Sequence, residues 1–162
     1  MLSPKMLEAL NQQINNELAS SYLYLAMASY MEAQTLPGTA HWLKRQAAEE
    51  NSHAMKLFDY VADRGAQVVL GAIAQPSQDF GSAQQLFERV LAHERNVTAS
   101  IHALYETAQS EKDYATQVML HWFINEQVEE EKSAGAIVDQ LRMIPERSTA
   151  LLYLDRQLGK RA

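Results

Sequence analysis

Four long segments of this chain carry apolar residues at alternating spacings of three and four, a period that confines each segment to an α-helix. A short fifth segment follows them. Their approximate ranges are 4–33, 39–64, 82–110, 113–144 and 148–159. Only six glycines and four prolines occur among the 162 residues, and most of them lie between these segments. The predicted fold class is therefore all-α.

The starts of three helices carry residue types that cap them. Ser3 precedes Pro4, which gives an N-cap followed by proline at the first helical position. Ser82 and Gln85 form a capping-box pattern. Asp113 is a suitable cap for the fourth helix. These caps support the helix starts that the periodicity predicts.

The lengths of the connections predict how the helices are arranged. Short links, including the turn TLPG at 35–38, make antiparallel hairpins of helices one and two and of helices three and four. The link at 66–81 has no helical period, and its sixteen residues can span ~50 Å. A helix of about 28 residues is only ~42 Å long, so this link can make helices two and three parallel. We expect one domain, residues 1–162: a four-helix bundle with one long crossover and a short fifth C-terminal helix.

Each of the four apolar stripes contains one glutamate near its middle, and the four should converge inside the bundle. They are Glu17, Glu50, Glu94 and Glu130. Burying one unpaired charge costs several kcal/mol, and like charges in one site raise each other's pKa. The stripes contain no Lys or Arg. The glutamates are therefore either protonated or matched by metal ions.

The residues around these glutamates indicate which metal would fit. His53 lies one turn from Glu50 and adds an imidazole nitrogen, while Glu50 could bridge two ions. Oxygen ligands with one nitrogen and no sulfur favour iron or manganese over zinc or copper, and the chain has no Cys. Tyr24, on the stripe of Glu17, is either a core aromatic or a hydrogen-bond and electron donor beside the metals.

A second acidic cluster flanks the first. Glu126, Glu129 and Glu130 lie on adjacent edges of the fourth helix, and Glu49 neighbours Glu50 on the second. Runs of this kind are usually a solvated helix face. Alternatively, the cluster is an entry or relay site for metal beside the paired site.

Charge and hydropathy exclude several classes of partner. The net charge of −6 argues against nucleic acid, because phosphate binding needs a concentrated basic patch. No apolar stretch approaches the roughly 20 residues that span a bilayer. The N-terminal sequence MLSPKMLEAL shows no secretory signal. We therefore expect a cytoplasmic protein with no membrane partner.

The chain resembles the bacterial non-haem ferritins over nearly its whole length, from LNQQINNELASSYLYLAMA to LLYLDRQL. The resemblance implies a di-iron ferroxidase centre and a catalytic role for Tyr24 beside it. The implied centre consists of Glu17, Glu50, His53 and Glu94, completed by Gln127 and Glu130. It also implies a third iron site formed by Glu49, Glu126, Glu129 and Glu130.

Related families differ at identifiable positions. Bacterioferritins carry a second E-x-x-H on the fourth helix, where this chain has QVEE at 127–130. They also ligate haem with a methionine where this chain has Asn51, so we expect no haem. Rubrerythrins usually append a four-cysteine domain, and the mini-ferritins that protect DNA build their centre between subunits.

The resemblance implies iron storage with ferroxidase activity. Fe(II) would be oxidised by dioxygen or peroxide, and ferric mineral would collect inside a shell of 24 subunits. The segment STALLYLDRQLG either folds back on the bundle end or packs with its copies in that shell. Two other functions remain open at this point: a di-iron oxidase or oxygenase acting on an organic substrate, and a non-enzymatic helical assembly with protonated glutamates.

Overall fold

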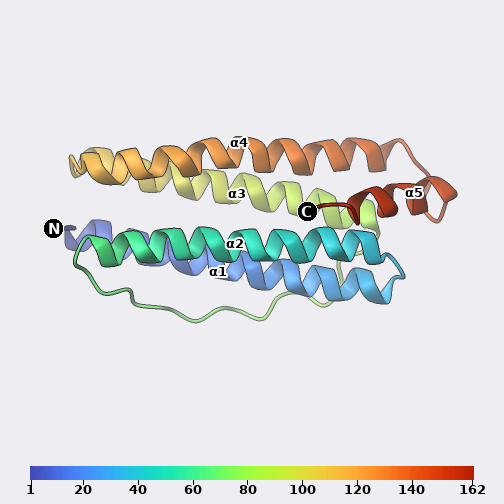
Figure 1. Cartoon of the computed structure of the whole chain (residues 1–162), viewed down its shortest axis with the longest axis horizontal. Helices are drawn as coiled ribbons and strands as arrows, with labels where there is room; N and C mark the ends of the chain where they lie inside the picture. Colours follow the sequence, from blue (N-terminus) through green and yellow to red (C-terminus); the bar gives the residue numbers. More distant parts are fainter.

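The computed structural model describes all 162 residues and contains five helices and no strand. The helices are α1 Pro4–Ala33, α2 Pro37–Asp63, α3 Ala83–Ser110, α4 Tyr114–Arg142 and α5 Thr149–Leu158. The first four lie side by side, and α5 lies at one end of them (Figure 1). This arrangement confirms the predicted all-α bundle with a short fifth helix. None of the helices combines the length and apolar character needed to cross a membrane.

The three predicted caps form as expected. The Ser3 hydroxyl accepts a hydrogen bond from the Met6 amide at 3.1 Å. Ser82 and Gln85 make both bonds of the capping box at the start of α3. The side chain of Asp113 accepts from the Thr116 amide at 3.1 Å and so caps α4. These bonds satisfy amide groups that the first helical turn leaves without partners.

The predicted turn at 35–38 is shorter than expected, because α2 already begins at Pro37. No local side chain caps this helix. Instead Asp155 of α5 accepts hydrogen bonds from the amides of Gly38 at 3.0 Å and Thr39 at 2.7 Å. A Cβ at residue 38 would lie 1.8 Å from the carbonyl oxygen of Asp155, so only glycine fits. The helix start therefore depends on a residue more than a hundred positions away.

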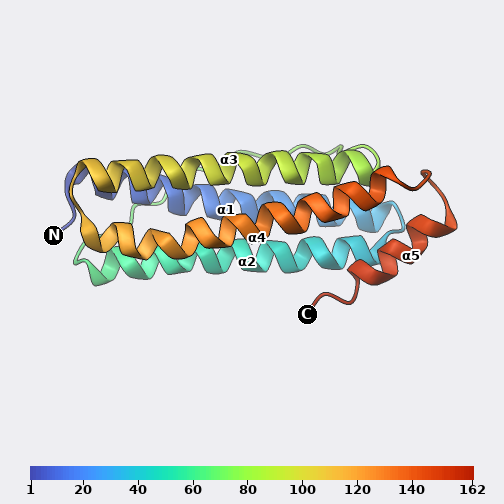
Figure 2. The ribbon, with the colours of Figure 1, turned by 90° about the horizontal axis from the view of Figure 1, so that it is seen from above.

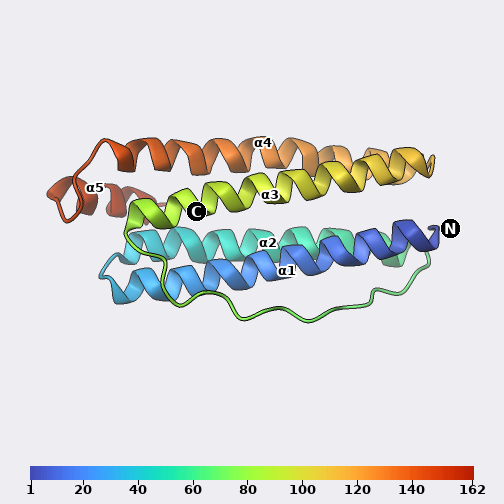
Figure 3. The same cartoon turned by 180° about the vertical axis from the view of Figure 1, so that it is seen from behind.

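The link between α2 and α3 runs the length of the bundle, as predicted (Figures 1 and 3). Two asparagines of α1 hold it in place. Asn11 accepts a hydrogen bond from the Val69 amide at 3.2 Å, and Asn15 accepts one from the Gly71 amide at 3.0 Å. Because the link returns the chain to the end of the bundle at which α2 begins, α2 and α3 are parallel.

Two apolar clusters fill the interior, one toward each end of the bundle. The cluster near α5 includes Met31, Leu43, Phe87, Val138 and Leu141. The cluster at the opposite end includes Met6, Leu10, Leu57, Ile101 and Leu120. Between them lies a polar layer. In Figure 2, α5 turns back beside α2, and the chain end follows the same helix.

Candidate metal centre

The polar layer contains all four glutamates that interrupt the apolar stripes, one from each of α1 to α4. Glu17, Glu50 and Glu94 are each 1% exposed, and Glu130 is 6% exposed. The helical period therefore placed them correctly inside the bundle. At this burial an ionised carboxylate needs a compensating partner.

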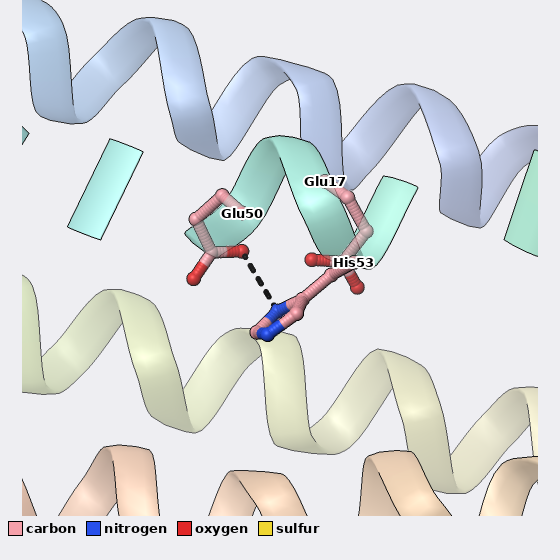
Figure 4. A group of neighbouring side chains, drawn as sticks. All are labelled: Glu17, Glu50 and His53. Carbon is pink, nitrogen blue, oxygen red and sulfur yellow. Dashed lines mark ion pairs between the residues drawn. The ribbon is translucent and has the colours of Figure 1, made fainter. Parts of the chain in front are cut away.

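His53 joins two of these glutamates in a compact group. Ligand atoms of Glu17, Glu50 and His53 all lie within 4.8 Å of one another. The Nδ1 atom of His53 is 3.7 Å from Oε2 of Glu50. In Figure 4 the three side chains point toward one another from α1 and α2. This spacing suits three ligands around one cation.

Each of the two glutamates in that group has one oxygen without a partner. Oε1 of Glu17 accepts from Gln13 at 2.8 Å, and Oε1 of Glu50 accepts from Gln46 at 3.3 Å. Their Oε2 atoms are buried and receive no hydrogen bond. Buried acceptors without donors are rare in native proteins. A cation between these atoms would satisfy both.

Burial and mutual repulsion make these carboxyl groups hard to ionise. Desolvation, followed by the charge of Glu50, raises the pKa of Glu17 well above its ordinary value. Desolvation is also the largest cause that raises the pKa of Glu50 to about 8 and that of Glu130 to about 7. Either protons or metal ions must therefore neutralise this layer near neutral pH.

Glu94 is held from two sides. The Tyr24 hydroxyl donates a hydrogen bond to its Oε1, and the Gln127 amide donates one to its Oε2 at 3.2 Å. Burial, and then the charges of Glu94 and Glu50, raise the pKa of Tyr24, so the phenol stays a donor. Gln127 presents its NH₂ group here, which cannot ligate a metal. In this arrangement Gln127 orients Glu94.

The fourth helix contributes a second group next to the first. Ligand atoms of His53, Glu126 and Glu130 lie within 4.8 Å of one another. Nε2 of His53 is 3.9 Å from Oε1 of Glu126. Two of the four residues predicted for a third site thus lie beside the paired glutamates.

The other two residues of that predicted site lie outside this group. Glu49 accepts a hydrogen bond from the guanidinium of Arg161. The side chain of Glu129 is 65% exposed, and its carboxylate lies 3.7 Å from Lys132. A metal-binding role for Glu49 and Glu129 stays a prediction.

Three residues that support the site were not identified from the sequence. Gln13 and Gln46 each precede a buried glutamate by four residues, which places donor and acceptor on one helix face. That spacing was visible in the sequence and could have revealed them. His93 packs edge-on against Tyr24, with ring centroids 5.7 Å apart, and its Nε2 lies 2.8 Å from the Ser20 hydroxyl. Only the fold reveals the role of His93.

Comparison with known proteins shows that this chain is similar to ferritins in both sequence and structure. A family model described as a ferritin-like domain matches residues 7–144. The chain is 40% identical over 161 residues to a bacterial non-heme ferritin of Staphylococcus aureus (strain USA300), covering 99% of this chain and 97% of that protein. A Staphylococcus epidermidis protein of the same name is 39% identical over 162 residues, covering 98% of its length. The crystal structure of an open-pore ferritin from the archaeon Archaeoglobus fulgidus is 50% identical, with a TM-score of 0.98 and complete coverage of both chains.

Proposed function

This chain belongs to the ferritin family, and on that premise we propose that it is an iron-storage protein with ferroxidase activity. Fe(II) is the substrate: two ions bind in the polar layer, are oxidised to Fe(III) and pass to a ferric mineral. One observation carries the proposal. Four buried glutamates meet in the core, and two of their oxygens have no partner within the chain.

The proposed ligands divide between two ion positions. Glu17 and His53 bind the first ion, and Glu94 and Glu130 bind the second. Glu50 lies between the two positions and bridges them. Gln127 completes the surroundings of the second ion by holding Glu94 in place, a role supported by its 3.2 Å hydrogen bond.

The electrons balance when two Fe(II) ions are oxidised in each step. Each Fe(II) gives up one electron, and dioxygen takes two electrons and two protons to leave as hydrogen peroxide. Peroxide takes two electrons from a second pair of Fe(II) and two protons from the solvent, and becomes two water molecules. The carboxylates attract Fe(III) more strongly than Fe(II) because the Coulomb energy grows with charge. The ligand set therefore favours the loss of an electron.

Tyr24 is proposed to act beside the second ion. Its hydroxyl donates to Glu94, a proposed ligand, so it holds that carboxylate and lies close to the iron. It can also give an electron to the oxidant, with its proton passing to Glu94. Complete burial of the side chain supports a role inside the site.

Iron is proposed to enter or leave past the second acidic group. Glu126 lies beside His53 and is partly exposed, which suits a position between solvent and the centre. We extend this second acidic group to Glu49 and Glu129, which together give the third iron site that the family resemblance implies.

Residues 1–162 act as one domain, and copies of it form a 24-subunit shell in the cytoplasm.

An oxidase acting on an organic substrate would need room for that substrate next to the iron. A cavity of about 820 Å³ lies at the α5 end of the bundle, between the α1–α2 turn, the start of α3 and the α4–α5 link. None of the proposed ligands lines it. This cavity therefore offers no room for an organic substrate beside the proposed ligands.

The test mixes Fe(II) and air with the purified, metal-free protein and follows ferric absorbance and particle mass together. The proposal predicts rapid oxidation and a particle that gains mass with each addition of iron. Oxidation no faster than in protein-free buffer would refute the ferroxidase activity. Fast oxidation without mineral, together with conversion of an added organic compound, would favour the oxidase instead.

A further inference from the structure

The residues that follow α5 bring an arginine to the edge of the metal centre. The guanidinium of Arg161 lies over the ring of Trp42, 4.4 Å from its centroid. Its Nη1 donates to the Trp42 carbonyl oxygen at 3.2 Å and to Oε1 of Gln46 at 2.9 Å. Its Nη2 donates to Glu49. Because Trp42, Gln46 and Glu49 are spaced by four and three, they lie on one face of α2.

Gln46 connects this arginine to the buried glutamates. The side chain is fully buried, and its Nε2 donates to Oε2 of Glu130 at 2.7 Å and to Oε1 of Glu50 at 3.3 Å. Its amide oxygen therefore faces Arg161, while its NH₂ group faces two carboxylates of the centre.

Only one orientation of the Gln46 amide suits both neighbours. A guanidinium carries donors and no acceptor, and an ionised carboxylate only accepts. Turning the amide over would direct its NH₂ group at the donors of Arg161 and its oxygen at Glu50 and Glu130. Such a mismatch leaves buried polar groups without partners, which is costly.

We propose that Arg161 is a positioning residue of the metal centre. By fixing the Gln46 amide, it holds Glu130 and Glu50 so that their remaining oxygens face the metal ions. The inference rests on the proposed function, because these carboxylates need a fixed orientation only if they bind metal. It also links the C-terminal segment of the chain to iron binding.

The contacts of the C-terminal segment allow this role to be tested without undocking the segment. His41 donates to the carbonyl oxygen of Arg161 at 2.7 Å, and Arg45 donates to the main-chain oxygen of Ala162 at 2.7 Å. Asp155 remains bonded to the start of α2. None of these bonds uses the guanidinium of Arg161. Arg161→Met also keeps an apolar stem over Trp42, so this variant should fold and assemble.

The experiment titrates the assembled protein with cobalt(II) in the absence of oxygen, following ligand-field absorption and heat. Cobalt(II) neighbours Fe(II) in affinity for such ligands and is not oxidised here. Arg161→Met should lower the affinity for the second ion, proposed to bind at Glu94 and Glu130, about tenfold, because one hydrogen bond to a charged group contributes about that much. The affinity for the first ion, at Glu17 and His53, should change by less than about threefold, because the bond from Gln46 to Glu130 is shorter than the bond from Gln46 to Glu50. Lys160→Ala removes a neighbouring charge whose ammonium donates a hydrogen bond to Gln157, and it should bind cobalt like the parent chain.

A double-mutant cycle separates positioning from simple charge compensation. If Arg161 acts through Gln46, adding Arg161→Met to Gln46→Met should weaken cobalt binding no further. Additive losses would show that Arg161 acts through its charge or through Glu49, and would overturn the inference. Binding by Arg161→Met equal to that of the parent chain would also overturn it. Failure of the parent chain to bind a pair of ions would refute the proposed function, and this inference with it.

Discussion

Two polar clusters lie among the helices of this bundle, and they are neutralised in opposite ways. Where α2 ends against the α3–α4 turn, Arg64 pairs with Asp113 at 3.0 Å. Thr116 adds a hydrogen bond from its hydroxyl to Asp113 at 2.7 Å. In the middle of the bundle, Glu17 and Glu50 face each other with an unpartnered oxygen each. The chain supplies an arginine as counter-ion for the first cluster, whereas no Lys or Arg pairs with Glu17 or Glu50 in the second.

The protonation of the two clusters differs accordingly. Burial alone would raise the pKa of Asp113, but hydrogen bonds from Arg64 and Thr116 outweigh it, and the pKa is lowered. At Glu50 burial is again the largest cause, and the charges of Glu94 and Glu130 add to it. The result is a pKa raised to about 8. The first cluster stabilises the fold, whereas the second is the one proposed to bind cations.

The largest effect is expected at Glu50, the glutamate proposed to bridge the two ions. Glu50→Ala removes a proposed ligand of both ions, so the initial rate of Fe(II) oxidation should fall more than about 100-fold, since one lost electrostatic contact in a transition state costs that much. Shell assembly, measured by sedimentation, should remain. Asp59→Ala, an exposed carboxylate on the same helix, is the matched control and should keep the parental rate. A Glu50→Ala variant as fast as this control would refute the site assignment.

The next effect concerns the cluster with its own counter-ion. Asp113→Ala removes both the cap of α4 and the partner of Arg64, and should lower the free energy of unfolding by about 2–3 kcal/mol. The melting temperature measures this loss. Oxidation of Fe(II) at a temperature where the variant is folded should be unchanged. Slower Fe(II) oxidation by that folded variant would contradict the view that the two clusters act independently.

A smaller effect follows from pH. Between pH 4.5 and about 8, the folded metal-free chain keeps a proton on Glu50 that the unfolded chain has lost, because the pKa of this group is raised on folding. More protons on the folded state mean that stability falls as pH rises through this window. Calorimetry should show the melting temperature of the metal-free protein falling there, with a shallower fall after cobalt(II) is added. Equal slopes with and without metal would argue against cation binding at these groups.

The smallest effect is expected at Tyr24. Tyr24→Phe removes the hydrogen bond to Glu94 and the phenolic proton but keeps the ring that fills the core. Oxidation should slow by about three- to tenfold, the worth of one hydrogen bond, with two cobalt(II) ions still bound per chain. Loss of the second ion would instead show that the hydroxyl is needed for binding, and an unchanged rate would exclude Tyr24 from the reaction.

Features that repeat along a helix were predictable from the sequence. The period of three and four gave the helices and placed Glu17, Glu50, Glu94 and Glu130 in the core, because one stripe per helix must face the interior. The long link after α2 gave the crossover, because its reach exceeds the length of a helix.

Contacts between distant segments were not predictable in this way. Nothing in the local pattern of Pro37 and Gly38 indicates a cap from Asp155, since that bond depends on where α5 docks. The contact of Arg161 with Gln46 has the same origin. The position of a carboxylate along a helix also does not indicate its partner. Glu49 was grouped with acidic neighbours in a predicted metal site, but its carboxylate accepts a hydrogen bond from Arg161.

The most direct test of cation binding by the buried glutamates is anomalous diffraction from crystals of the assembled protein soaked with Fe(II) without oxygen. Two iron peaks per chain are expected. One should lie among Glu17, Glu50 and His53, and the other among Glu50, Glu94 and Glu130. Well-ordered glutamates with no iron peak between them, in crystals that take up iron elsewhere, would contradict the account.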